Sequence, residues 1–290
     1  MNDGDAALFE EMTWPEVAAA AAASAVAVLP VGSLEQHGHH LPLGSDAIVS
    51  FGLAQRLGRR RPMVILPPLY YAARSQPRAS GVARAFPGSV GLHGQALTEV
   101  CRDLVADLFR SGFRHVLVLN GHYENAGFLF EGLASASEDH PGTTALLVNW
   151  WDQLRDADLP RIFPDGFPGW EIEHAGIAET SLVEELRPDL VRQDRKTDDP
   201  GTRVLTYDVF PLPADAVPPT GVPARSTPAS RDIGRYIADA LVDRIDAILT
   251  RELTTAGAAA EPHPTGPQPA ESQPANPAGP DSASGVTLRS

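Results

Sequence analysis

The sequence has a single cysteine and lacks any apolar run long enough to cross a bilayer. One cysteine, Cys101, excludes an intramolecular disulfide and suits a reducing compartment, so we expect a cytoplasmic protein. Cys101 shares the apolar face of a predicted helix with Leu97 and Leu104, which favours a core residue over a catalytic thiol. The most apolar stretch, residues 18–31, is too short for a membrane span and follows acidic residues, unlike a secretory signal.

Basic residues are also scarce. The formal net charge is -14, and no block of Lys and Arg is present. Proteins that bind nucleic acid normally show a basic face, so we expect neither a nucleic-acid partner nor a membrane partner. Hydrophobic residues make up 43% of the 290 residues, which is enough for a sizeable core. The composition therefore predicts a globular protein.

The chain divides by composition into a folded part, residues 1–254, and a tail, residues 255–290. The tail is rich in Ala, Pro, Gly and Ser and has too few large apolar residues to fold, so we expect it to be disordered. In the folded part, short apolar runs predict buried strands at Ala25–Pro30, Met63–Leu66, Val116–Leu119 and Ala145–Val148. Amphipathic stretches predict helices at Asp46–Arg59, Gln95–Phe109, Asn125–Ser137, Ala175–Leu186 and Arg231–Glu252. This alternation predicts an α/β fold: a three-layer αβα sandwich around a mostly parallel sheet.

Two loops that follow predicted strands carry side chains suited to binding metal. The first contains Glu35 and His37, which point to the same side in extended backbone, and Asp46 follows at the next helix start. The second contains His122 and Glu124, with the same spacing in reverse order. Ligand sites in parallel sheets lie at the carboxyl ends of strands, where both loops fall. Imidazole and carboxylate ligands suit zinc and manganese.

Charge counting favours two divalent ions over one. Glu35, Asp46 and Glu124 supply three negative charges, two divalent ions supply four positive ones, and a bridging hydroxide completes the balance. One Glu-x-His pair is common in surface loops, whereas two pairs after buried strands, with an Asp at a helix start, favour a metal site. We expect His39 and His40 to lie outside the ligand set.

A third segment, residues 169–181, gathers acidic residues and a histidine beside a tryptophan. Glu171, Glu173 and His174 follow Trp170, and Glu179 comes shortly after. The segment is compatible with acid–base chemistry beside an aromatic wall, and equally with the acidic first turn of a helix. The residues alone leave both interpretations open.

Taken together, these motifs resemble the creatininase (creatinine amidohydrolase) family. The resemblance is carried by Leu-Pro-Val-Gly-Ser-Leu-Glu-Gln-His-Gly-His-His at 29–40, Asn-Gly-His-Tyr-Glu-Asn at 120–125 and Gly-Trp-Glu-Ile-Glu-His-Ala-Gly at 169–176. It extends in order from about Met12 to Leu253. The Tyr-Glu-Asn that follows Asn-Gly-His favours the creatininases themselves over family members that act on formamides or on a mycofactocin peptide.

The resemblance implies roles for individual residues. It implies that Glu35, Asp46 and His122 bind one ion, often manganese. His37, Asp46 and Glu124 would bind the other, often zinc, with Asp46 bridging. It makes His174 the proton-transferring residue and places Glu173 and Glu124 with it among the catalytic residues. Glu173 or Glu179 is close enough in sequence to orient His174. It implies substrate contacts by Ser80, Tyr123, Trp151, Trp170, Glu171 and His174. It also implies a three-layer fold and a hexamer.

Two departures from the family pattern concern the substrate. Glu171 stands where creatininase carries a shorter Asp, and the loop at residues 74–81 is one residue longer and contains Pro77. The resemblance as a whole implies reversible hydrolysis of creatinine to creatine by a metal-bridging hydroxide, with His174 as proton donor. The alternatives are the same chemistry on another cyclic or small amide, and a metal-binding protein without catalysis.

Overall fold

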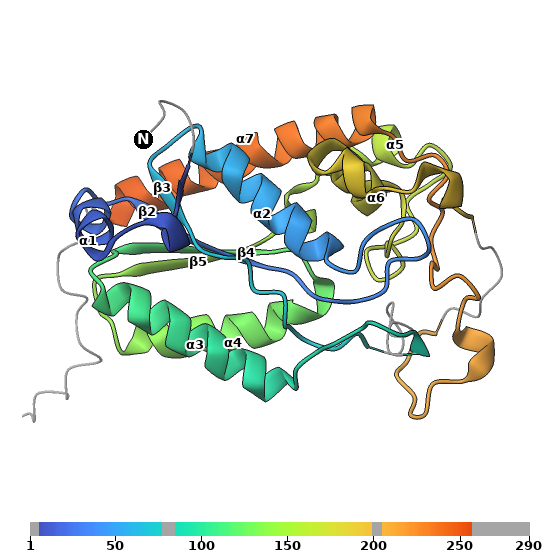
Figure 1. Cartoon of the computed structure of the whole chain (residues 1–290), viewed down its shortest axis with the longest axis horizontal. Helices are drawn as coiled ribbons and strands as arrows, with labels where there is room; N and C mark the ends of the chain where they lie inside the picture. Colours follow the sequence, from blue (N-terminus) through green and yellow to red (C-terminus); the bar gives the residue numbers. More distant parts are fainter. Residues whose placement is uncertain (1–5, 77–84, 199–204, 257–290) are drawn as a thin grey trace, which may run out of the picture.

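Figure 1 shows the computed structural model, which describes residues 6–76, 85–198 and 205–256. A five-stranded sheet, in the order β1-β3-β2-β4-β5, lies at its centre, and every neighbouring pair of strands is parallel. The strands are β1 (Ala7–Leu8), β2 (Val26–Val31), β3 (Met63–Ile65), β4 (His115–Asn120) and β5 (Thr144–Asn149). The four apolar runs predict β2, β3, β4 and β5, and β1 at one edge was not predicted.

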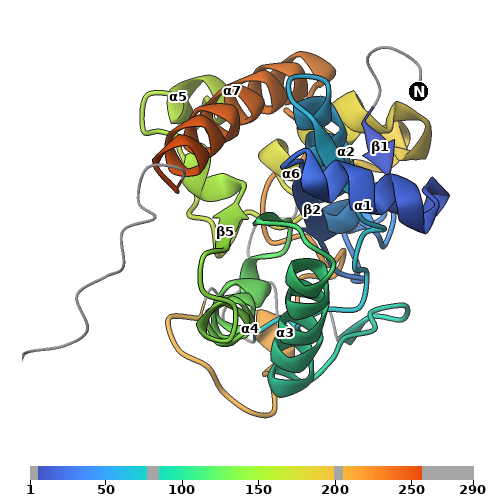
Figure 2. The same cartoon turned by 90° about the vertical axis from the view of Figure 1, so that its left-hand side faces the viewer.

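Helices cover both faces of the sheet, as Figures 1 and 2 show. On one face lie α2 (Ser45–Gly58), α6 (Ile177–Leu186) and α7 (Arg231–Ala256). On the other lie α3 (Gly94–Arg110) and α4 (Ala126–Glu138). Shorter elements are α1 (Trp14–Ala22), α5 (Leu159–Ile162), η1 (Phe9–Glu11), η3 (Tyr123–Asn125), η4 (Trp151–Gln153), η5 (Pro188–Leu190), η6 (Gln193–Arg195) and η7 (Ala214–Ala216). The predicted three-layer αβα fold is confirmed.

The two layers of core come from alternation along the strands. In β2, Val26 and Val28 pack toward α2 and α7, whereas Ala27 and Leu29 pack toward α3. Successive side chains of a strand point to opposite faces, and all six residues of β2 are buried. A strand that is covered on both faces has no solvent-exposed side and needs no polar residues at alternate positions. These strands are therefore continuous apolar runs in the sequence.

Two amino-terminal elements, α1 and β1, were not predicted from the sequence. Helix α1 ends at Ala22, and a turn at Ser24, with φ of 58°, leads into β2, which is the strand predicted at Ala25–Pro30. Helix α1 carries a capping box between Thr13 and Glu16, a sequence signal that could have identified it. Strand β1 has only two residues, too few for a periodic pattern.

Two expectations lie outside the described residues. Ser80 falls in the segment 77–84, and the tail lies beyond residue 256. Helix α7 continues to Ala256, past the domain end placed at residue 254. Within residues 6–76, 85–198 and 205–256, no helix combines the length and apolarity that a bilayer span requires.

Two glycines after neighbouring strands let α2 approach the sheet edge. A Cβ on Gly32, which follows β2, would lie 2.1 Å from the backbone nitrogen of Ala47. A Cβ on Gly121, which follows β4, would lie 2.2 Å from the backbone oxygen of Asp46. Any side chain at these positions would push the first turn of α2 away. The two glycines therefore place Asp46 between the ends of β2 and β4.

Candidate metal centre

The five predicted metal ligands meet at the carboxyl end of the sheet. Glu35 and His37 lie in the loop after β2, Asp46 lies in the first turn of α2, and His122 and Glu124 follow β4. None of the five is more than 5% exposed. Residues up to 89 positions apart in the chain converge because parallel strands end at a common edge.

Three of these side chains form a compact group. Nδ1 of His122 lies 3.3 Å from Oε1 of Glu35 and 3.1 Å from Oδ2 of Asp46. One ligand atom from each residue lies within 4.8 Å of the others, so the three could hold one ion. This is the set predicted for the first ion.

Asp46 extends toward a second group with its other oxygen. Nε2 of His37 lies 3.0 Å from Oδ1 of Asp46 and 3.7 Å from Oε2 of Glu179 on α6. Glu179 therefore completes this group. Glu124 lies beside His122 instead, with Oε2 3.3 Å from its Nε2. The assignment of Glu124 to the second ion stays a prediction, and Glu179 is a candidate that spacing did not identify.

The charges in the cluster are balanced by protons on its histidines. Burial disfavours a charged ring, yet the carboxylates of Asp46, Glu179 and Glu35 outweigh it and raise the pKa of His37 to about 10. The pKa of His122 is also raised, mainly by Glu35 and Glu124 against the effect of burial. Burial likewise opposes the shift at Asp46, whose pKa is lowered by both imidazolium rings. Metal ions bound to these carboxylates would supply the positive charge that the protonated rings otherwise supply.

The donor set fits divalent metal ions. Oδ2 of Asp46, Nε2 of His122 and Oε2 of Glu124 are buried and have no hydrogen bond of acceptable geometry. In the described part of the chain, the ion-pair contacts of these carboxylates are with histidines, not with Lys or Arg. Buried polar atoms without partners are costly, and metal coordination would satisfy them. Metal binding would also release the histidine protons.

Side chains around the ligands hold them in place, and the sequence alone did not single these out. Ser75 donates a short hydrogen bond to Oε2 of Glu35, and the backbone nitrogen of Gln76 donates to Oε1 of Glu124 at 3.0 Å. Oδ1 of Asn120 accepts from the backbone nitrogen of His122 at 3.1 Å. Such outer contacts orient ligands and tune their basicity. Asn120 and Asn125 flank the Gly-His-Tyr-Glu segment, and this position is the signal that could have identified them.

His174 lies against this cluster and is held by Gln36. Its Nε2 donates to the backbone oxygen of Gln36 at 2.8 Å, which leaves Nδ1 facing Oε1 of Glu35 at 3.5 Å. Burial, together with the positive charge of His37, lowers the pKa of His174 to about 4. Gln36 therefore orients this ring, a role that no spacing indicated, and the orienting role expected for Glu173 or Glu179 stays a prediction.

The two glutamates instead stabilise the start of α6. Oε1 of Glu173 accepts from the backbone nitrogen of Ala178 at 2.6 Å, and Oε2 of Glu179 accepts from that of Ala175 at 2.7 Å. Burial raises the pKa of Glu173 to about 7 and that of Glu179 to about 8. The helix-start interpretation therefore describes Glu173 well. The catalytic role predicted for Glu173 stays a prediction.

Ring contacts connect three of the predicted substrate residues. The ring of Tyr123, which is 38% exposed, lies 5.5 Å from that of Trp151, which is 6% exposed. Trp150 lies between Trp151 and Trp170, in ring contact with both. Trp170 is half-buried, and Glu171 beside it is exposed. The substrate contacts of these residues stay a prediction.

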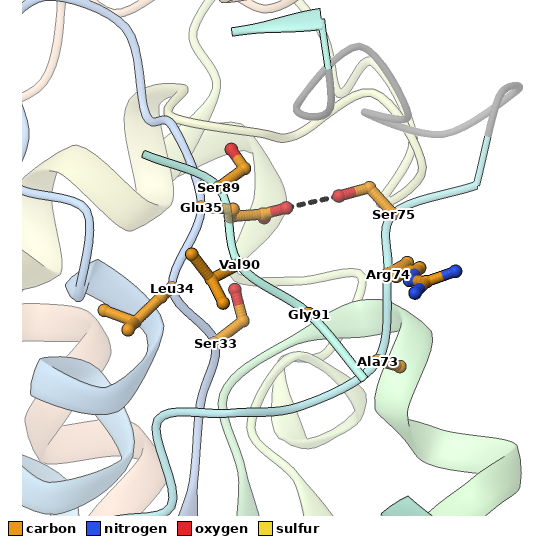
Figure 3. Close-up of a pocket in the computed structure, with 9 residues that line it drawn as sticks. All are labelled: Ser33, Leu34, Glu35, Ala73, Arg74, Ser75, Ser89, Val90 and Gly91. Carbon is orange, nitrogen blue, oxygen red and sulfur yellow. Dashed lines mark hydrogen bonds between the residues drawn. The ribbon is translucent and has the colours of Figure 1, made fainter. Parts of the chain in front are cut away.

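A cavity of about 240 Å³ opens beside Glu35, as Figure 3 shows. Its walls come from the loop after β2, the segment 73–75 and the segment 89–91. Glu35 and Ser75 face each other across it. A cavity that reaches a buried carboxylate cluster is a place where a small substrate can meet the ligands.

The remaining histidines of the first loop are not ligands in this geometry. His40 is buried, and its Nε2 lies 2.9 Å from the hydroxyl of Thr180 on α6. His39 is exposed. His40 therefore links the metal loop to α6, and both residues lie outside the ligand groups of the described residues.

Comparison with known proteins places this architecture in one family. A family model described as "Creatininase: Creatinine amidohydrolase" matches residues 10–249. A creatinine amidohydrolase of Pseudomonas putida is 38% identical over 246 residues, which are 82% of this chain and 94% of that protein. A mycofactocin precursor peptide peptidase of Mycobacterium tuberculosis is 31% identical over 74% of this chain and 81% of that protein.

Solved structures agree with these relatives. A crystal structure of creatinine amidohydrolase (creatininase) matches with a TM-score of 0.81 and 37% identity, covering 85% of this chain and 98% of that one. Further creatininase structures of the same coverage, at 35–36% identity and a TM-score of 0.80, include a manganese form, a zinc–zinc form and a complex with creatine.

Proposed function

The chain belongs to the creatininase family and is a metal-dependent hydrolase of amide C–N bonds; on this premise we propose that it hydrolyses creatinine reversibly to creatine. The observation that carries the proposal is the buried convergence of Glu35, Asp46 and His122 beside His174. Support comes from the similarity to a creatinine amidohydrolase over most of the chain. A creatininase structure complexed with creatine supports the same substrate class.

We assign two divalent ions, zinc or manganese, to the cluster. The two oxygens of Asp46 face different histidines, Oδ1 toward His37 and Oδ2 toward His122, as a bridging carboxylate would. Glu35 would complete the first site, and Glu124 or Glu179 the second. When bound, the ions would acidify a water molecule to give a nucleophile and would polarise the substrate carbonyl.

His174 would move the proton that amide hydrolysis requires. Its Nε2 is committed to the backbone oxygen of Gln36, so Nδ1 is the atom free to act. A neutral Nδ1 can accept a proton as water attacks and then deliver it to the departing ring nitrogen. Without that delivery the leaving group would be an amide anion, which is a very poor one. Burial of His174 keeps bulk water from competing for the proton.

The aromatic residues would receive the flat lactam ring. Trp151 and Trp170 offer faces for stacking, and Tyr123 and Glu171 offer polar groups at the exposed side. The substrate contact predicted for Ser80 stays a prediction. The second candidate function is the same chemistry on another cyclic or small amide. It is favoured by Glu171, whose longer side chain changes the polar wall of the site.

A substrate panel on metal-loaded protein tests the proposal. Creatinine, creatine, other lactams and short peptides would each be incubated with protein loaded with zinc or manganese, and product release measured. We expect creatinine to give the highest kcat/KM. A fully loaded protein that hydrolyses another cyclic amide much faster would establish the second candidate. The hexamer that the family resemblance implies can be checked on the same sample by light scattering.

A further inference from the structure

We propose that Trp150 is a positioning residue that sets the angle and separation of Trp151 and Trp170. The inference rests on the proposed function, which assigns those two rings to the substrate. Trp150 itself is 2% exposed, so it offers a ligand almost no surface of its own. Its role would be exerted through the two rings it touches.

The backbone fixes Trp150 to the end of the sheet that carries the metal ligands. It directly follows β5, and its backbone nitrogen donates to the oxygen of Asn120 at 3.3 Å. Asn120 is the last residue of β4, and its side chain holds the backbone of His122. The position of the Trp150 ring is therefore tied to the metal loop by two consecutive hydrogen bonds.

The ring of Trp150 meets both neighbouring tryptophans edge to face. Its centroid lies 5.9 Å from that of Trp151, at an interplanar angle of 85°, and 5.6 Å from that of Trp170, at 79°. Within the described part of the chain, no ring contact joins Trp151 directly to Trp170. Trp150 is thus the ring through which their relative orientation is set.

The other supports of the two rings are separate. Trp170 packs against Phe163 and Phe167, at 6.2 and 4.7 Å between centroids, whereas Trp151 packs against Tyr123 at 5.5 Å. Edge-to-face contacts are directional, because the positive edge of one ring meets the negative face of the other. An aliphatic side chain of similar bulk could fill the space of Trp150 but would impose no angle on its neighbours.

The test compares a ring with an aliphatic side chain at position 150. Trp150→Phe keeps an aromatic ring with an edge and a face, whereas Trp150→Leu keeps only apolar volume. If Trp150→Leu does not fold, Trp150→Met takes its place as the aliphatic variant. Phe113→Leu is the matched control, because Phe113 is 1% exposed in the core on the opposite face of the sheet. All variants are prepared as metal-loaded full-length protein.

The first readout needs no substrate. Labelling with 5-fluorotryptophan gives one ¹⁹F resonance for each of the four tryptophans, and Trp14→Phe identifies the exposed one. We expect Trp150→Leu to shift or broaden the resonances of Trp151 and Trp170, while Trp150→Phe leaves them narrow and near their original positions. Phe113→Leu should leave them unchanged even though it lowers the melting temperature.

The second readout is the split between KM and kcat for creatinine. We expect Trp150→Leu to raise KM about tenfold with little change in kcat, and Trp150→Phe to restore KM to within about twofold. Unchanged resonances and KM in Trp150→Leu, or equal effects of Phe113→Leu, would overturn the proposal. If the parent protein does not hydrolyse creatinine, the proposed function fails, and the ¹⁹F comparison alone decides the role of Trp150.

Discussion

Two clusters of charged side chains in this protein differ in burial and in the residues that balance their negative charge. At the metal centre, Glu35 and Asp46 are buried, and their partners are histidines. Between α2 and α7, arginines meet aspartates in a row at the surface: Arg56 with Asp239, Arg60 with Asp243 and Arg61 with Asp246. In these contacts the metal cluster has no partner with a permanent positive charge, whereas the arginines of the second cluster supply that charge.

This difference in the balancing charge distinguishes ion pairs that are complete within the fold from a cluster that can bind a cation. In the α2–α7 row each carboxylate has a guanidinium that carries its charge at every physiological pH. In the metal cluster the balancing charge is a proton on His37 or His122, which a cation can displace. A cluster of buried carboxylates whose ion-pair contacts are with histidines, not with Lys or Arg, therefore fits a site that binds a cation.

The largest effect should follow from breaking the metal cluster at Asp46. Asp46→Ala removes the carboxylate whose oxygens face both histidines, so we expect loss of both ions and of all measurable activity. Elemental analysis of the dialysed protein measures the first, and product release the second. Chelation of the parent protein should give the same inactive state, reversible on adding zinc or manganese.

The matched control is the same substitution in the α2–α7 row. Asp243→Ala removes a carboxylate that is 66% exposed and pairs with Arg60. We expect full metal content and normal turnover in this variant. Full metal occupancy in Asp46→Ala would contradict the bridging assignment, and loss of metal in Asp243→Ala would contradict the separation of the two clusters.

A second effect tests His174 without removing charge from the cluster. His174→Asn should keep both ions and the fold but lower kcat by about 10²–10⁴-fold, because no group then delivers a proton to the leaving nitrogen. Pre-steady-state and steady-state rates, with metal content measured on the same sample, check this. His140→Asn is the control. His140 follows α4, and its Nδ1 lies 2.8 Å from the backbone oxygen of Ala136. Near-normal turnover with metals bound would exclude His174 as the proton-transferring group.

Much of the fold and of the metal site could be predicted from sequence. The buried strands β2 and β4 are apolar runs because both of their faces are covered. The ligands Glu35 and His122 could be paired because parallel strands end at one edge. Both inferences use rules that depend on local pattern and on topology, not on the exact path of the loops.

What sequence could not provide are contacts between loops. Gln36 holds His174 although 138 positions separate them, and Glu179 reaches His37 from a helix on another segment. Neither contact follows from periodicity or spacing, because both depend on where the loop before α6 folds back. Strand β1 was missed for a simpler reason: two residues carry no pattern.

A third charged pair, between Glu184 and Lys196, is an intermediate case that sharpens the comparison. It is buried like the metal cluster but contains its own cation, the only lysine in the sequence. Lys196→Met should therefore destabilise the protein by about 3 kcal/mol, because Glu184 would stay buried without a partner. Urea denaturation measures this. The double variant Glu184→Met/Lys196→Met should recover much of the loss, and equal loss in both would contradict a charge-based effect.

The smallest effect should come from the α2–α7 row itself. Arg60 and Asp243 are 40% and 66% exposed, so water already solvates both groups and the pair gains little from contact. We expect Arg60→Ala to lower the free energy of unfolding by about 0.5 kcal/mol, with kcat/KM unchanged. In 1 M salt, where the Debye length falls to about 3 Å, the difference between Arg60→Ala and the parent should shrink further. The metal content of the parent, measured in the same salt, should not change, because its ligands are buried and salt screens them weakly. A loss of metal at high salt, together with a salt-independent effect of Arg60→Ala, would show that the two clusters do not differ in the way their burial indicates.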